Sequence, residues 1–292
     1  MQVTQLQDAV KRSRQVAVGE FDGVHIGHRA VIAGNDTVLT FEPHPMVVID
    51  PSRAPKLLTS LDLKIELIER LGVEELVIVT FDDQIAHESP DEFVSRVLVA
   101  QLGATAISVG ENFRFGHRAT GTTALLHADR RFQERIVPLV QLDGAIVSSS
   151  RIRETIDAGD VTEAARLLGD PFRIRGRVVH GDQRGRELGF PTANVVPDAQ
   201  LVCPANGVYA CRVGEHVAAV NVGVRPTFGE NLHLLVEAFL LDFSGDLYGQ
   251  EITVEFVERL RGEERFDDVD SLIAQMTRDV EAARELLGSS TA

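Results

Sequence analysis

Cysteine is scarce in this 292-residue sequence, which contains only Cys203 and Cys211. Two cysteines cannot build a disulfide framework or a multi-cysteine zinc site. Disulfides are rare in proteins of reducing compartments, so this scarcity is typical of a protein that works among reduced thiols. The cysteine content therefore predicts a cytoplasmic location.

Long apolar runs are also missing. The longest, such as Leu76 to Val79, fall far below the ~18 residues that a membrane-spanning helix needs. The N-terminal segment contains Lys11, Arg12 and Arg14 but no apolar core of a secretory signal. We therefore expect no transmembrane segment and no membrane partner.

Basic residues are outnumbered, with 29 Lys and Arg against 44 Asp and Glu, for a formal net charge of −15. A general nucleic-acid binder would carry a basic footprint, so this balance argues against nucleic acid as a partner. It still permits an anionic small molecule, because backbone amides and one or two arginines are enough to hold a phosphate.

The length fits about two domains, and the first half reads as an α/β domain. Strands are expected over 16–18, 37–41, 76–81 and 106–109, and helices over 61–71 and 90–102. Near-continuous apolar strands that alternate with helices predict a parallel sheet covered on both faces.

The second half has a different pattern. Short helices are expected over 150–158 and 161–168, and a break at Gly169 marks the domain boundary, dividing the chain into 1–169 and 170–292. Alternating strands follow over 173–179, 207–213, 216–222, 233–241 and 251–260, separated by Gly and Pro. They predict an antiparallel β-barrel that ends in a terminal helix over 269–287.

A histidine pair follows the first strand. The segment from Gly19 to His28 reads GEFDGVHIGH and should open the first helix. His25 and His28 then lie beside free backbone amides at the positive end of the helix, where imidazole N–H groups can donate to phosphate oxygens. The spacing would also suit a metal pair, but no third ligand lies nearby in the sequence, so we expect phosphate binding rather than zinc.

The His-x-Gly-His pattern resembles the signature of the nucleotidyltransferase superfamily, and six further motifs occur in the order seen in bacterial bifunctional riboflavin kinase/FAD synthetases. These motifs are FEPHP at 41–45, GENFRFG at 110–116, SSSRIR at 148–153, GRELGFPTAN at 185–194, NVGVRPTF at 221–228 and VEAFLLDF at 236–243. The resemblance implies a Rossmann-like FMN adenylyltransferase (FAD synthetase) domain over 1–169 and a riboflavin kinase (flavokinase) barrel over 170–292.

This resemblance implies a two-step activity in flavin biosynthesis. The second domain would convert riboflavin and ATP to FMN and ADP, and the first would convert FMN and ATP to FAD and pyrophosphate. ATP is then the co-substrate of both steps, Mg²⁺ the cofactor, and riboflavin and FMN the small-molecule substrates. The sequence leaves the oligomeric state open.

In the first domain, the resemblance adds six residues to the catalytic histidines His25 and His28. They are Gly19, Phe21, Ser149 and Arg151 for ATP and its phosphates, Asn112 for the nucleotide or flavin, and Glu42 as a candidate for positioning magnesium-bound triphosphate. Asn112 follows a strand at the carboxyl edge where parallel sheets bind ligands. Hydroxyls, helix-start amides and a guanidinium over 148–153 make a suitable anion cradle.

In the second domain, a flexible loop should approach the ATP phosphates through Gly181, Arg184, Gly185 and Gly189. Thr192 and Asn194 point the same way on an extended segment and offer hard oxygen ligands for Mg²⁺. Glu237 interrupts an apolar strand, where a carboxylate is costly to bury unless it is paired or used. The resemblance makes Glu237 the general base that takes the proton of the ribityl 5′-hydroxyl.

Two features of the first domain depart from the family pattern. Only the segment 29–39 separates His28 from Thr40, so the expected helix is little more than one turn, from Arg29 to Ala33. Glu20 adds a carboxylate beside the phosphate site, which opposes anion binding unless a cation pairs with it. These departures keep open one alternative, a chain in which only the kinase works. A second alternative, from a different class, is a flavin- or nucleotide-binding module without turnover.

Overall fold

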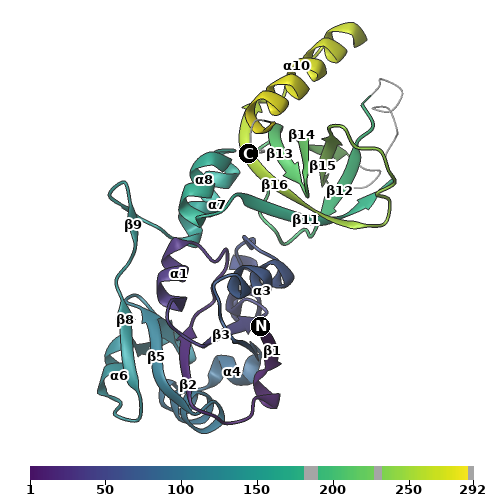
Figure 1. Ribbon diagram of the computed structural model, residues 1–292. Helices are drawn as coiled ribbons and strands as arrows, with labels where there is room; N and C mark the ends of the chain where they lie inside the picture. The colour runs from purple at the N-terminus through teal and green to yellow at the C-terminus, as the bar shows by residue number, and fades with distance from the viewer. Residues whose placement is uncertain (181–189, 227–231, 289–292) are drawn as a thin grey trace. The chain divides into compact units, whose positions relative to one another are not determined.

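The structure is a computed structural model that describes residues 1–180, 190–226 and 232–288, without the side chains of 224–234. Its contacts divide the chain into two compact units, Met1–Ser149 and Ser150–Ala292 (Figure 1). Among the described residues, no helix has the length and apolar character needed to cross a membrane.

The first unit is built on a six-stranded parallel sheet in the order β1-β4-β3-β2-β5-β8. Its strands are β1 (Gln2–Gln5), β2 (Arg14–Val18), β3 (Thr37–Glu42), β4 (Glu75–Thr80), β5 (Ala104–Gly110) and β8 (Gln133–Val137). The four predicted strands are confirmed as β2 to β5, and the parallel pairing is confirmed as well. The edge strands β1 and β8 are additions that the sequence pattern does not predict.

Short helices connect these strands: α1 (Ile26–Ile32), α2 (Pro45–Ile49), α3 (Leu61–Glu69), α4 (Asp83–His87), α5 (Pro90–Phe93) and α6 (Thr123–Ala128). A capping box between Ser89 and Glu92 starts α5, which continues as the π-helix η3 (Val94–Gln101). The remaining short elements are 3₁₀ turns η1 (Leu6–Asp8), η2 (Pro51–Arg53) and η4 (His117–Ala119), and strands β6 (Arg114–Phe115), β7 (Gly121–Thr122), β9 (Gln141–Leu142) and β10 (Ala145–Ile146).

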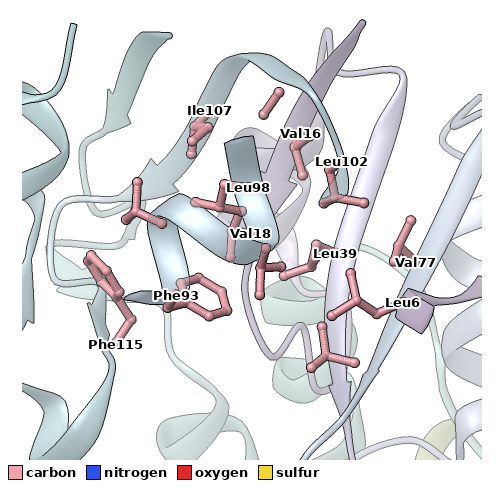
Figure 2. Close-up of a cluster of buried hydrophobic side chains, with 14 of the residues drawn as sticks. Leu6, Val16, Val18, Leu39, Val77, Phe93, Leu98, Leu102, Ile107 and Phe115 are labelled. Carbon is pink, nitrogen blue, oxygen red and sulfur yellow. The ribbon is translucent and has the colours of Figure 1, made fainter. Parts of the chain in front are cut away.

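Both faces of the parallel sheet are buried, as predicted. Val16 and Val18 of β2 belong to the cluster that includes Leu98 of η3 (Figure 2). Between them, Ala17 belongs to the opposite cluster, which includes Ile68 of α3. Successive residues of a strand point to opposite faces, so this alternation requires apolar cover on both sides.

Helix α1 begins earlier than the sequence analysis predicts. It spans Ile26–Ile32 rather than Arg29 to Ala33, because Nδ1 of His25 accepts a hydrogen bond from the His28 backbone N–H at 3.2 Å and caps the helix. The expectation of barely more than one turn is therefore wrong. The helix has about two turns, and His28 lies within the first of them.

The second unit contains a closed antiparallel barrel, with its described strands in the order β11-β12-β15-β14-β13-β16. They are β11 (Phe172–Val179), β12 (Ala193–Pro197), β13 (Gly207–Val213), β14 (His216–Pro226), β15 (Leu232–Leu240) and β16 (Glu251–Arg261). The terminal helix α10 (Val269–Leu287) packs against β13 and β14. The predicted barrel and terminal helix are confirmed.

Two helices precede the barrel, α7 (Ser149–Asp157) and α8 (Val161–Leu168). Helix α8 contacts β11 and β16, and the contacts group both helices with the barrel. The boundary between the compact units therefore falls after Ser149 in the sequence, ahead of Gly169. The division of the two activities at Gly169 stays a prediction.

Candidate active sites

The first candidate site lies at the carboxyl edge of the parallel sheet, between β2 and β5. The chain passes from β2 to β3 and β4 on one side and then to β5 on the other, so the strand order switches here. Connections diverge at such a switch point and leave a crevice for ligands. A cavity of about 260 Å³ occupies it, and its lining includes six predicted site residues: Gly19, Phe21, His25, His28, Asn112 and Ser149.

The two histidines form a stacked pair on the cavity wall. Their ring centroids are 3.5 Å apart and their planes differ by 19°, while the Phe21 ring packs edge-on against His28 at 5.4 Å. A Cβ atom on Gly27 would lie 3.0 Å from Cε1 of His25, which is closer than side chains normally approach. Glycine between the histidines therefore leaves room for the His25 ring.

The turn before α1 has unusual backbone angles and is held in place by hydrogen bonds. Phe21 and Val24 have φ angles of 53° and 42°, in a region that residues other than glycine rarely adopt. The buried Asp22 carboxylate accepts from the Leu58 backbone N–H at 2.9 Å. The Ser149 hydroxyl donates to the Asp22 backbone oxygen at 3.0 Å, which fixes Ser149 to the same turn.

Glu20 is paired with a cation that the sequence analysis misses. Lys64 of α3 is buried, its Nζ lies 3.4 Å from Oε1 of Glu20, and it donates to the Glu20 backbone oxygen at 3.0 Å. Burial raises the pKa of Glu20 to about 8, against the opposing effect of the Lys64 charge, and the Asp22 carboxylate adds to the rise. The available signal was a lysine among the apolar positions of the helix predicted over 61–71.

Two predicted residues are not among those that line this cavity. Glu42 ends β3, and burial raises its pKa against the effect of the Lys64 charge. Arg151 belongs to the second compact unit, where its Nη2 donates to Oε1 of Glu163 at 3.0 Å. In the part of the chain that the structure describes, no group of three or more His, Cys, Asp or Glu side chains could hold a metal ion.

The second candidate site lies on the outer face of the barrel, where β12, β15 and β14 are adjacent. Asn194 and Asn221 are both register partners of Glu237, so these three residues form one row across the strands. Nδ2 of Asn221 donates to Oε2 of Glu237 at 3.3 Å. The next row, Val195 and Val236, is fully buried inside the barrel, so the Glu237 row faces outward.

Two cavities adjoin this row. A cavity of about 770 Å³ is lined by Asn221 and Glu237 from the barrel together with residues of α10. A cavity of about 690 Å³ is lined by Asn194 and the segment 242–248. Thr192 and Phe239 line both cavities, so a group bound in one lies next to a group bound in the other.

An ion pair on the α10 side of the larger cavity is a second feature that the sequence analysis misses. Arg261 Nη2 lies 2.8 Å from Oδ2 of Asp279, and Nε2 of Gln275 donates to Oδ1 of Asp279 at 2.9 Å. Both members of the pair line the cavity.

The expected phosphate-binding loop residues lie outside the described residues: Gly181, Arg184, Gly185 and Gly189.

Comparisons with known proteins find matches for both parts of the chain. A FAD synthetase family model matches residues 7–151, and a riboflavin kinase model matches 168–287. The bifunctional riboflavin kinase/FMN adenylyltransferase of Listeria monocytogenes is 38% identical over 93% of this chain and 92% of its own length. The protein of the same name from Pseudomonas fluorescens is 39% identical, over 94% of this chain and 93% of its own.

A crystal structure from Streptococcus pneumoniae, described as a macrolide-efflux protein, has the same fold. It is 31% identical, with a TM-score of 0.88, and the match covers 97% of this chain and 99% of that one. Both domain models match in order, and the relatives are covered almost end to end. The chain therefore belongs to the family of bifunctional riboflavin kinase/FMN adenylyltransferases.

Proposed function

We propose that this chain phosphorylates riboflavin to FMN at the barrel and adenylylates FMN to FAD at the parallel sheet, with ATP as co-substrate of both steps. The observation that carries the proposal is that the predicted residues of each step gather at separate cavities. His25 and His28 line the cavity at the sheet edge, and Thr192 and Glu237 line the larger barrel cavity. The test is to supply riboflavin, ATP and Mg²⁺ and to follow FMN and FAD separately.

In the kinase step, Glu237 acts as the general base. Its carboxylate takes the proton of the ribityl 5′-hydroxyl as that oxygen attacks the γ-phosphorus of ATP. A bond forms between the 5′-oxygen and phosphorus, the bond from phosphorus to the β–γ bridging oxygen breaks, and ADP leaves. The hydrogen bond from Asn221 at 3.3 Å holds the carboxylate in the larger cavity, which we assign to the flavin.

Thr192 and Asn194 fit a magnesium ion that arrives with the nucleotide. A hydroxyl and an amide oxygen are hard donors, and Mg²⁺ in such sites takes one or two protein ligands besides phosphates and water. Asn194 is only 6% exposed yet lines the smaller cavity, which we assign to ATP, and Thr192 lies where both cavities meet. When bound, Mg²⁺ would offset the negative charge of the transferred phosphoryl group.

Thr192→Ala and Asn194→Ala should each raise the KM for MgATP in the kinase step by about tenfold or more, because each removes a candidate oxygen ligand. FAD formation from supplied FMN should not change, because both residues belong to the second unit. The measurement is the steady-state kinetics of both steps in one preparation. Thr277→Ala, at an exposed position of α10, is the matched control. Equal damage to both steps in a folded variant would contradict the assignment.

In the adenylyl-transfer step, the phosphate of FMN attacks the α-phosphorus of ATP and pyrophosphate leaves, so no protein nucleophile is needed. His25 and His28 donate N–H groups to phosphate oxygens as negative charge develops on them. Asn112 and Ser149 line the same cavity and orient the reactants. Arg151 and Glu42 keep the ATP and magnesium roles that the family resemblance implies.

We expect the KM values of FAD synthesis to rise at alkaline pH in the wild type, and Glu20→Gln should reduce this rise. The pKa of Glu20 is about 8, so its carboxyl is neutral below that pH and becomes negative above it. The added charge beside the cavity repels the phosphates of ATP and FMN, and KM for both should rise as pH increases through 8. Glutamine stays neutral throughout. Parallel KM profiles for the wild type and Glu20→Gln on both sides of pH 8 would contradict the assignment.

The proposal places the enzyme in the cytoplasm, with riboflavin, FMN and ATP as its partners rather than nucleic acid or a membrane. The two cysteines and the net charge of −15 support this placement. Fractionation of cells that express the tagged chain would test it.

A further inference from the structure

The C-terminal end of α1 is held by side chains from outside the helix. The last carbonyls of a helix have no partner within it. The Val31 carbonyl accepts from Asn35 Nδ2 at 3.0 Å and from Arg135 Nη2 at 2.7 Å, and the Ala33 carbonyl accepts from Arg135 Nη2 at 2.6 Å. Asn35 Nδ2 also donates to the Ile32 carbonyl at 3.1 Å. Two side chains thus satisfy three consecutive carbonyls.

Ser108 joins these two side chains and anchors them to the sheet. Arg135 Nε donates to Ser108 Oγ at 3.0 Å, and Ser108 Oγ donates to Asn35 Oδ1 at 3.0 Å. Ser108 of β5 and Arg135 of β8 are register partners on neighbouring strands. The end of α1 is therefore linked to two strands of the parallel sheet.

The anchored end of α1 is part of the candidate active site. Val31 lines the same cavity as His25 and His28. Its carbonyl is the one that accepts hydrogen bonds from both Arg135 and Asn35. Helix α1 has seven residues, so His28 lies less than one turn from Val31. A shift at this end of so short a helix would move the His28 ring as well.

We propose that Arg135 and Asn35, joined through Ser108, are positioning residues for the adenylyl-transfer step. They fix the orientation of α1 and so direct the rings of His25 and His28 into the cavity. The inference rests on the proposed function of this site. It explains how so short a helix supports a catalytic pair: hydrogen bonds to the sheet take the place of further helical turns.

Arg135→Ala should lower kcat for FAD formation about tenfold, because a displacement below 1 Å is enough to misplace a catalytic group. KM for FMN and ATP should stay near the wild-type values, since the histidines act on charge that develops in the transition state. FMN formation in the same preparation should not change. Arg130→Ala, at an exposed arginine of the same unit, is the matched control and should leave both steps unchanged.

A double-mutant cycle with His28→Ala distinguishes positioning from a general loss of structure. If Arg135 acts through His28, Arg135→Ala should cost little more once the ring is absent. An equal fold-loss of kcat in both backgrounds would overturn the inference. If Arg135→Ala does not fold, Ser108→Ala breaks the same network, and wild-type kcat in that variant would also overturn it. A wild-type chain that makes no FAD would refute the proposed function instead, whereas normal FAD synthesis by a folded Arg135→Ala would refute only this inference.

Discussion

Glu237→Gln should nearly abolish FMN formation, with a loss of kinase turnover of ~10² to 10⁴-fold. Glutamine keeps the size of the side chain and an oxygen that can accept the hydrogen bond from Asn221, which lies 3.3 Å away. It cannot take the proton of the ribityl hydroxyl. The loss should therefore appear in kcat, and the binding of riboflavin and ATP should remain largely intact.

Two controls make this result specific to the kinase step. FAD formation from supplied FMN should proceed normally in Glu237→Gln, because that step uses the first unit. Glu251→Gln changes an exposed carboxylate of the same barrel and should leave FMN formation unchanged. Near-normal kinase turnover in Glu237→Gln would remove Glu237 from the role of general base.

His28→Ala should severely reduce FAD synthesis while FMN production stays unchanged. Removal of one preorganised donor to a developing charge typically costs ~10² to 10³-fold in kcat. The ring lies on the cavity wall, stacked on His25 at 3.5 Å and against the edge of Phe21. Chromatographic separation of FMN and FAD during one time course measures both activities.

The matched control for this prediction is His127→Ala, an exposed histidine on α6 of the same unit. It should leave both products unchanged. If His28→Ala made FAD at the wild-type rate, the histidine would have no part in the mechanism, and the cavity at the sheet edge would need another explanation.

Local sequence patterns predicted most of the secondary structure, because apolar periodicity reports burial directly. The start of α1 was the main error. The expected helix began at Arg29, whereas the His25 side chain caps the helix and lets it begin at Ile26. A histidine is an uncommon N-cap, since Ser, Thr, Asp and Asn are preferred, so the capping signal was easy to miss.

The contacts that support the sites were harder to predict than the site residues. Arg135 of β8, far from α1 in the sequence, donates a hydrogen bond to the end of that helix, and Lys64 of α3 contacts Glu20. No motif or regular spacing in the sequence signals either contact, because the partners are far apart in the sequence and only the fold brings them together. Glu42 shows the opposite difficulty: its motif is recognisable, but the side chain is not among those that line the described cavity.

The most direct test of the central claim is to incubate the wild-type chain with riboflavin, excess ATP and Mg²⁺ and to quantify every product over time. The two-site account predicts that FMN appears first and FAD follows, with one ADP released for each riboflavin phosphorylated and one pyrophosphate for each FAD formed. FMN that accumulates without FAD would contradict the account and leave a kinase alone, and the absence of both products would leave a binding module.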